Sequence, residues 1–186
     1  MRTLKLLQKE NVLFFLLFFI ALGARLWGLG ERPLHHDESL HALYSKYLYF
    51  PSNSFFYEYR PMLHGPLLYY LTAPFLWILG EAHFFIRLFP ALLGSFLALT
   101  PFFWRRYLGR TLAVGISLYL CFSPLSLYWS RFLRHDPLFL TILFSLFLLA
   151  TTWKNKVKWA IIPFLCFTLF TIKENAYLYL IFAATF

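Results

Sequence analysis

The sequence predicts an all-α protein, a polytopic transmembrane helix bundle with a long outer first loop that contains juxtamembrane helices. Of its 186 residues, 60% are hydrophobic and only 13% are charged, which is about half the charged share of a soluble domain. The apolar residues also form runs long enough to cross a lipid bilayer. This composition excludes a disordered chain, a disulfide scaffold and almost every soluble domain.

The basic net charge of +9 is best explained by membrane topology. Lys and Arg collect in cytoplasmic loops of membrane proteins, so the charge does not require nucleic acid and we expect no such partner. The two cysteines, Cys121 and Cys166, both lie within apolar runs. We therefore expect them to be small buried hydrophobic residues.

The first span is predicted over residues 12–29, after a basic N-terminal segment. A signal peptide is the alternative, but no small-x-small cleavage site follows the apolar run. The later spans are predicted at residues 84–104, 112–128, 138–153 and 159–172, with an incomplete sixth at 176–186. Because a span needs about 20 residues, we interpret residues 1–186 as one transmembrane domain that is truncated at its C-terminus.

The charged residues agree with this threading. The predicted cytoplasmic segments carry nine basic residues and one acid, Glu10; the basic residues are Arg2, Lys5, Lys9, Arg105, Arg106, Arg110, Lys154, Lys156 and Lys158. The predicted outer segments carry the other acids, which are Glu31, Asp37, Glu38, Glu58, Glu81, Asp136 and Glu174. We therefore expect a multi-pass protein of the cell (inner) membrane with a cytoplasmic N-terminus and its chemistry on the extracytoplasmic side.

The outer loop, residues 30–83, is predicted to contain two short helices. Residues 40–50 have the pattern of a short amphipathic helix. Residues 66–79 are apolar, but they are too few to span a bilayer and include Pro74. If they did span, the cluster at residues 105–110 would face outward, so we place them as a juxtamembrane or re-entrant helix.

The first candidate site is the segment ERPLHHDESLH, residues 31–41. The whole chain has only two aspartates, Asp37 and Asp136, and both fall at predicted outer membrane edges, where ionisable residues are costly and usually functional. We predict catalytic roles for Asp37 and Glu38, with supporting roles for His35, His36 and His41. Helix capping at the interface is the alternative; it explains one acid but not three histidines.

The second candidate site is the segment YWSRFLRHDP, residues 128–137, between two spans. Arg131 and Arg134 are three residues apart and would share one face of a helical turn. On the Arg-poor outer side they are candidates for binding a phosphate, and Asp136 is a candidate catalytic acid. The alternative is that the arginines reach lipid headgroups while Asp136 caps a helix.

Two shorter segments complete the set of candidates. His64 precedes a Gly-Pro turn and an aromatic helix, a pattern that is equally typical of a plain interfacial turn. Lys173 and Glu174 lie between two apolar runs, where they would also form an ordinary self-neutralising pair. We include His64 and Lys173 among the phosphate-binding candidates and Glu174 among the supporting residues.

The order of HHDE, HGPLLYY, RLFPALLG and the RxxRHD-type turn resembles the GT-C superfamily of integral membrane glycosyltransferases. The chain is similar to protein O-mannosyltransferases and lipid A aminoarabinose transferases, and most similar to the prokaryotic flippase-activity-associated subgroup. In this resemblance Asp37 matches the first-loop acid and Asp136 the second-loop acid. The family's Lys-Pro-Pro element corresponds to residues 64–66, where a histidine replaces the lysine.

The resemblance implies an inverting transfer of a sugar from a polyprenyl-phosphate donor to an extracytoplasmic acceptor. Asp37 would be the base, and Arg131, Arg134, His64 and Lys173 would hold the phosphate. The implied partners are the polyprenyl-phosphate-linked sugar, membrane lipids and an acceptor protein, lipid or glycan. No cofactor is required, and a divalent cation is left open.

Two other classes of protein remain as alternatives. A membrane metalloprotease would need His at position 37 for an H-E-x-x-H motif, where this chain has Asp37; bound zinc would distinguish it. A non-catalytic transporter or scaffold fragment is the other. Transporters usually place their charges near the bilayer midplane, whereas here the charges are predicted at one face.

Overall fold

The computed structural model describes residues 2–49, 64–152 and 158–184. Within these ranges every regular element is an α-helix, so the all-α prediction is confirmed. The helices are α1 (Arg2–Leu26), α2 (His36–Tyr47), α3 (Leu67–Leu79), α4 (His83–Phe103), α5 (Arg105–Leu108), α6 (Arg110–Phe122), α7 (Pro124–Ser130), α8 (His135–Thr152), α9 (Lys158–Phe170) and α10 (Ala176–Ala184). Three charged residues of the predicted topology, Glu58, Lys154 and Lys156, lie outside the described residues.

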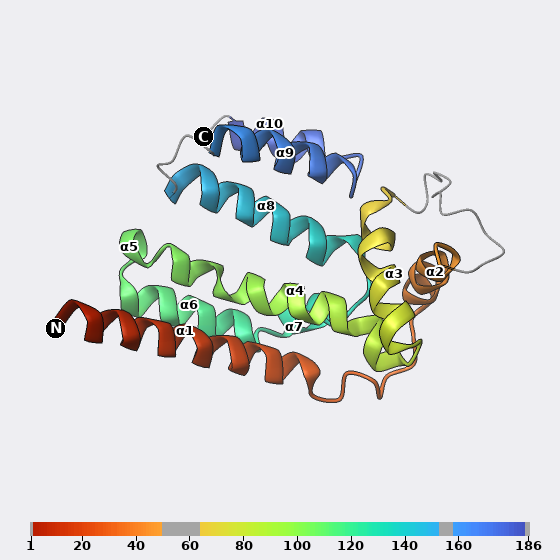
Figure 1. Ribbon diagram of the computed structural model, residues 1–186, viewed down its shortest axis with the longest axis horizontal. Helices are drawn as coiled ribbons and strands as arrows, with labels where there is room; N and C mark the ends of the chain where they lie inside the picture. The colour runs from red at the N-terminus through yellow and green to blue at the C-terminus, as the bar shows by residue number, and fades with distance from the viewer. Residues whose placement is uncertain (1, 50–63, 153–157, 185–186) are drawn as a thin grey trace.

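The long helices run back and forth along one axis (Figure 1). α4 is central, since it packs against α1, α6 and α8, and α9 packs on the far side of α8. α2 and α3 pack on each other and lie across one end, whereas α5 lies at the opposite end with the N-terminus (Figure 1). The two helices predicted within the outer loop are therefore both present.

Membrane-helix character is present in part of this bundle. Among the described residues, α4 and α8 are long and apolar enough to cross a membrane, and the bent pair α6–α7 would be a third span if counted as one. The stretches Val12–Leu26, Leu67–Leu79 and Trp159–Phe170 are apolar but shorter. The arrangement of six spans stays a prediction.

The predicted third span, residues 112–128, is broken into α6 and α7, which meet at an angle of 61°. Pro124 has no backbone N–H, so the carbonyl of Leu120 loses its helical donor. The guanidinium of Arg25, which is fully buried, replaces that donor: it donates to the Leu120 carbonyl at 3.2 Å and to the Ser126 hydroxyl at 2.9 Å. A buried arginine of the first helix thus stabilises the break.

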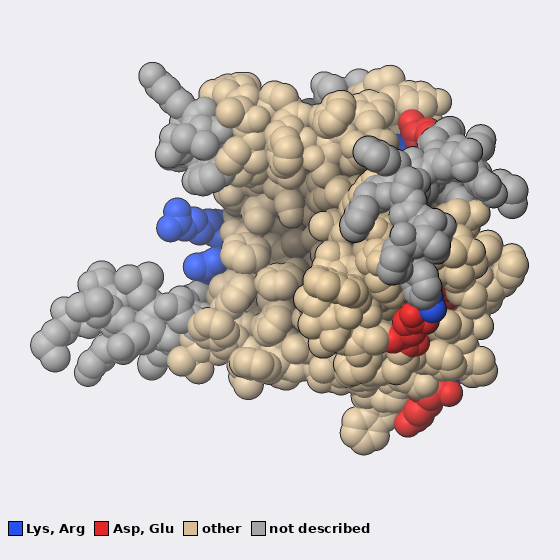
Figure 2. All heavy atoms as spheres, turned by 45° about the vertical axis from the view of Figure 1, so that its right-hand side comes forward, with Lys and Arg blue, Asp and Glu red and all other residues tan. Residues whose placement is uncertain are grey.

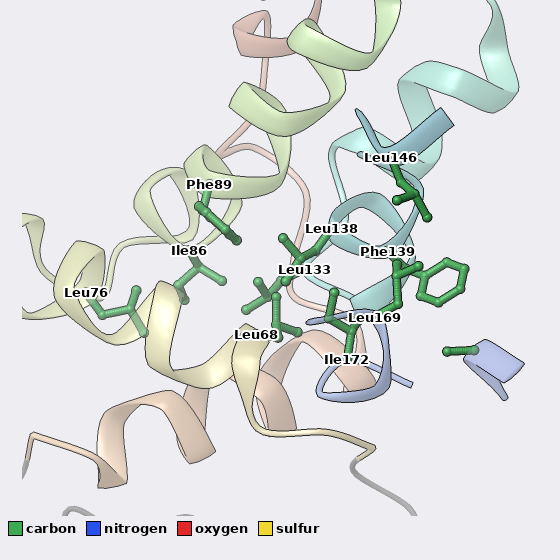
Figure 3. Close-up of a cluster of buried hydrophobic side chains, with 11 residues drawn as sticks. Leu68, Leu76, Ile86, Phe89, Leu133, Leu138, Phe139, Leu146, Leu169 and Ile172 are labelled. Atoms are coloured by element: carbon green, nitrogen blue, oxygen red, sulfur yellow. The ribbon is translucent and has the colours of Figure 1, made fainter. Parts of the chain in front are cut away.

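A hydrophobic core joins the end helices to the bundle (Figure 3). It contains residues of α3, α4, α8, α9 and α10 and of the turns before α8 and after α9, namely Leu68, Leu76, Ile86, Phe89, Leu133, Leu138, Phe139, Leu146, Leu169, Ile172 and Ala176. Leu68 and Leu76 are both nearly inaccessible. Their burial fixes α3 across the end of α4 and α8.

The two ends of the molecule differ in charge. In Figure 2 one end carries only Lys and Arg among its visible charged atoms, and all visible Asp and Glu lie toward the opposite end. The basic end is the one at which α5, with Arg105 and Arg106, lies in Figure 1. Among the side chains that the structure describes, the acids therefore lie toward the end opposite Arg105 and Arg106, while the membrane side that each end faces stays a prediction.

Gly94→Ala should destabilise the fold, because the new Cβ on α4 would lie 2.0 Å from the Cβ of Ser130 on α7. Overpacking of this kind costs about 1–3 kcal/mol. Gly115→Ala is the matched control on α6: nothing lies within 4 Å of its Cβ, so it should be neutral or stabilising by up to about 1 kcal/mol. Thermal unfolding in detergent measures both.

Adding Ser130→Gly to Gly94→Ala should restore most of the lost stability, because it removes the side chain that the new Cβ would meet. The double variant and the two single variants form a thermodynamic cycle. Purely additive losses in that cycle would show that this contact between α4 and α7 is not the cause.

Candidate functional site

Most of the sequence-predicted site residues meet in one cavity at the α2/α3 end. This cavity, of about 80 Å³, is lined by Asp37, Leu40, His41, His64, Arg134, His135, Asp136 and Lys173. We call it the aspartate cavity. Its walls come from four segments that are far apart in the sequence, and both aspartates of the chain face it.

The turn at residues 64–66 reaches the cavity by docking on the end of α9. The Gly65 N–H donates to the Ile172 carbonyl at 3.1 Å, and the Leu67 N–H donates to the Thr171 carbonyl at 3.2 Å. A Cβ on Gly65 would lie 2.1 Å from the Thr171 carbonyl oxygen, so this approach requires glycine. It places His64, whose φ of 60° is left-handed, within 3.1 Å of the Glu174 carboxylate.

The charges around the aspartate cavity balance one another. A guanidinium nitrogen of Arg134 lies 3.5 Å from Asp37 and another lies 3.8 Å from Asp136. The Lys173 ammonium lies 2.5 Å from Asp136. Asp136 therefore has two cationic partners, whereas Asp37 has Arg134 and, at 3.9 Å, the ring of His35. Asp37 is the more available of the two carboxylates.

Three histidine rings, those of His41, His64 and His135, line the aspartate cavity and contact one another. The ring of His41 contacts that of His135 at a centroid distance of 4.9 Å, and the ring of His64 contacts His135 at 5.3 Å. His41 Nδ1 is hydrogen-bonded to the Tyr69 hydroxyl at 2.9 Å. Burial, aided by the charge of Arg134, lowers the pKa of His41 to about 4. At neutral pH His41 is therefore a neutral hydrogen-bonding group rather than a cation.

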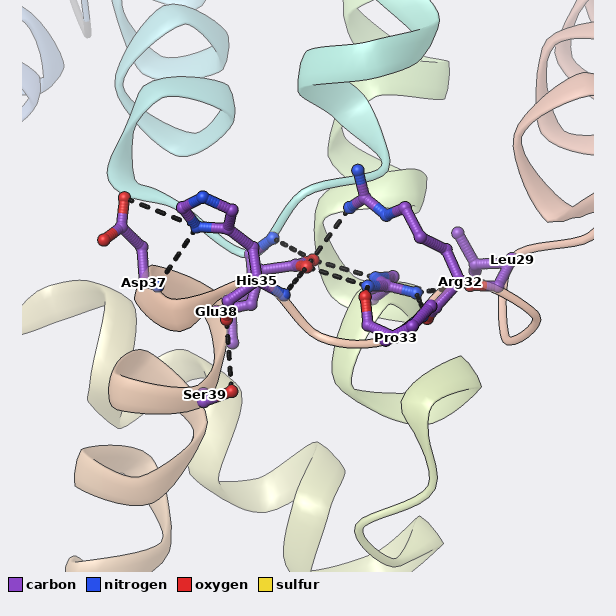
Figure 4. A network of polar contacts seen from close by, with 9 residues as sticks. Leu29, Arg32, Pro33, His35, Asp37, Glu38 and Ser39 are labelled. Atoms are coloured by element: carbon purple, nitrogen blue, oxygen red, sulfur yellow. Dashed lines mark hydrogen bonds and ion pairs between the residues drawn. The ribbon is translucent and has the colours of Figure 1, made fainter.

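Glu38, although adjacent to Asp37, is buried and does not line the cavity; Figure 4 shows its polar contacts. Arg87 donates from Nε to one carboxylate oxygen and from a terminal nitrogen to the other, both at 2.8 Å. The backbone N–H groups of His35 and Leu133 donate to the same carboxylate at 3.0 and 3.3 Å. Burial alone would raise the pKa of Glu38, but the hydrogen bonds from Arg87 and the backbone lower it below its usual value.

Arg131 does not line the aspartate cavity, contrary to the sequence prediction that it shares a face with Arg134. Helix α7 ends at Ser130, and Arg131 begins a turn, so the spacing of three residues no longer has helical geometry. The Arg131 guanidinium instead donates to the Trp27 carbonyl at 2.6 Å and lines a second cavity.

The three histidines of the first segment also separate. His35 caps α2: its Nδ1 accepts a hydrogen bond from the Asp37 N–H at 3.2 Å. His36 is exposed at the start of α2. Only His41 lines the aspartate cavity, so the arrangement that a metalloprotease would need is not formed by these three residues.

Sequence reasoning missed two residues of this region, Arg87 and His135. Arg87 is a charged residue inside an apolar run, and such residues are usually functional or tightly paired. That signal was available in the segment HFFIRLFP. His135 lies between Arg134 and Asp136, but only its burial in the structure marks it as a wall of the cavity.

The described residues contain no three His, Cys, Asp or Glu side chains placed to hold one metal ion. No family model, curated protein sequence or solved structure matches the chain. Candidate roles at this site therefore depend on its geometry and chemistry.

Glu38→Gln should destabilise the protein by about 3–5 kcal/mol, because it leaves the buried Arg87 without its ionic partner. Glu81→Gln is the matched control, since Glu81 pairs with Lys46 at the surface and such pairs contribute at most about 1 kcal/mol. Unfolding curves of the two variants in the same detergent make the comparison. Equal losses would contradict the structural role of Glu38.

Stability should fall as the pH falls from about 6.5 to about 4. The unfolded chain protonates His41 below its ordinary pKa of 6.5, whereas the folded protein does so only near 4, so protons favour unfolding in this window by up to about 3 kcal/mol. His41→Gln should flatten this part of the pH dependence of the unfolding midpoint. His36→Gln, at an exposed position, should leave it unchanged; equal flattening by both would contradict the assignment.

Proposed function

We propose that this chain belongs to an inverting glycosyltransferase that moves a sugar from a polyprenyl-phosphate donor to an acceptor. The acceptor would be a protein, a lipid or a glycan on the extracytoplasmic side. The proposal includes the six-span bundle in the cell (inner) membrane with a cytoplasmic N-terminus. No step of it requires a metal ion.

One observation carries the proposal: the aspartate cavity lies next to a large apolar cavity. The apolar cavity has a volume of about 540 Å³ and is lined by residues of α4, α6, α7 and α8. Trp129 lines it and lies under the Arg134 guanidinium, 5.6 Å from its carbon to the ring centroid. Pro137 lines it as well and directly follows Asp136. A ligand with a charged head and a long hydrocarbon tail fits this pair of cavities.

The sizes of the cavities suggest which part of the donor each would hold. At about 80 Å³ the aspartate cavity is smaller than ordinary small-molecule sites of about 300–1,000 Å³. It suits a phosphate and the reacting carbon rather than a whole sugar. The polyprenyl chain would lie along the apolar cavity.

The residues of the aspartate cavity support a single displacement. Asp37 would accept the proton of the acceptor hydroxyl or amine as that atom bonds to the anomeric carbon. The bond between this carbon and the phosphate oxygen breaks at the same time, so the configuration inverts. Arg134 and Lys173 would stabilise the departing phosphate.

Charge balance suggests how the donor would activate the base. In the absence of donor Arg134 pairs with both aspartates. A phosphate that binds Arg134 would compete with Asp37 for the guanidinium. Release of Asp37 from Arg134 would leave its carboxylate free to accept a proton, so that donor binding prepares the base.

Asp37→Asn should lower transfer by about 10²–10⁴-fold, because an amide cannot act as the base. Donor binding should be retained or become tighter, since the variant removes the carboxylate that competes for Arg134. Glu81→Gln, which changes an acid that lies outside the cavity, should leave transfer unchanged. Product formation from a radiolabelled polyprenyl-phosphate sugar measures transfer; full transfer by Asp37→Asn would refute this role.

Arg134→Ala should weaken donor binding by about 1.5–3 kcal/mol, because it removes a charge-assisted contact to the phosphate. Arg106→Ala, on α5, is the control for loss of one positive charge. Equilibrium binding of the donor to purified protein measures the effect. Unchanged affinity in Arg134→Ala would contradict the assignment of the phosphate site.

A further inference from the structure

The cavity that Arg131 lines, which we call the arginine cavity, lies on the side of the Glu38–Arg87 pair away from the aspartate cavity. It has a volume of about 270 Å³ and is lined by Gly28, Leu29, Arg32, Arg87, Pro124, Leu127, Tyr128 and Arg131. Three of these residues are arginines. The Glu38 carboxylate pairs with Arg87 and Arg32, and the charge of Glu31 acts on Arg131. Unlike the aspartate cavity, this one has an excess of positive charge.

The three arginines differ in how many hydrogen bonds they can still donate. Arg87 spends its guanidinium on Glu38 and on three backbone carbonyls. Among the described residues, Arg32 donates from one nitrogen to Glu38 and Arg131 from one nitrogen to the Trp27 carbonyl. A guanidinium has five N–H donors, so Arg32 and Arg131 keep donors for a ligand.

Aromatic residues orient Arg32 in the arginine cavity and indicate the level of the cavity relative to a bilayer. The Arg32 guanidinium lies over the rings of Tyr128 and Phe132, at 5.8 and 5.3 Å from their centroids, which orients its planar fork. The side chains of Trp27 and Tyr128 beside the cavity are 84% and 50% exposed. Exposed Trp and Tyr at the ends of apolar helices are typical of the headgroup level of a bilayer.

We propose that the arginine cavity binds the phosphate of an anionic membrane-lipid headgroup. The two partly free guanidinium forks supply the paired donors that phosphate oxygens accept, and the aromatic residues place them where headgroups lie. This site stands independently of the sugar transfer, because no step proposed for the aspartate cavity uses Arg32 or Arg131.

Binding of short-chain lipids to the purified, delipidated protein in a neutral detergent tests the proposal. Dihexanoyl phosphatidylglycerol should bind, and Arg131→Gln should weaken its binding on the order of tenfold, the effect of one charge-assisted contact. Arg32→Gln should weaken it similarly. Arg106→Gln, which removes the same charge on α5, should leave the affinity unchanged.

Dihexanoyl phosphatidylcholine and inorganic phosphate distinguish the possible sources of the anion. Weaker binding of both, with unfolding midpoints of the variants unchanged in the absence of lipid, supports an anionic lipid. Inorganic phosphate that binds as tightly as the lipid overturns the lipid assignment. Unchanged lipid affinity in folded Arg131→Gln, with Arg131→Lys as the second variant, overturns the site itself. Sugar transfer is not needed for any of these readouts.

Discussion

The buried ion pair between Glu38 and Arg87 holds the α2/α3 end of the molecule together (Figure 4). Arg87 comes from α4, and its hydrogen bonds reach α2 and the carbonyls of Leu29, Arg32 and Pro33 in the loop after α1. Glu38 also accepts the Leu133 N–H from the turn before α8. Burial of both charges is favourable only because every part of the pair is hydrogen-bonded. Asp37 and Arg134, each adjacent to a residue of this network, are thereby brought to one cavity.

The same requirement, that buried polar groups be satisfied, explains the irregular parts of the bundle. The break between α6 and α7 leaves the Leu120 carbonyl without a helical donor, and Arg25 supplies one from α1. The Gly65 turn hydrogen-bonds the end of α9 in place of a further helical turn. In an apolar medium unsatisfied groups would cost several kcal/mol each. Irregular backbone therefore occurs where a side chain or another loop provides the missing partner.

Much of the helical plan was predictable because apolar runs and prolines are local features. The helices at residues 83–103 and 135–152 and the two loop helices follow from such runs. Convergence of Asp37 and Asp136 followed from their places at one predicted face. The position of Arg131 was not predictable, because it depends on where α7 ends rather than on the spacing of three residues. The partnership of Glu38 with Arg87, 49 positions away, depends on helix packing that no local pattern reveals.

The aspartate cavity and the arginine cavity differ in electrostatics, although the turn between α7 and α8 contributes a lining residue to each. In the aspartate cavity each cation already has a carboxylate within 4 Å, so an incoming anion must displace a carboxylate before it gains full contact. Such a site would bind an anion less tightly than a site with unpaired cations. In return, the displaced carboxylate would lose its ion pair and become available for chemistry, as a reaction centre requires. In the arginine cavity the shared Glu38 is locked by Arg87, and the remaining positive charge faces the cavity. An anion bound there as proposed would gain its contacts with Arg32 and Arg131 without displacing a carboxylate, which would favour stable occupancy over chemistry.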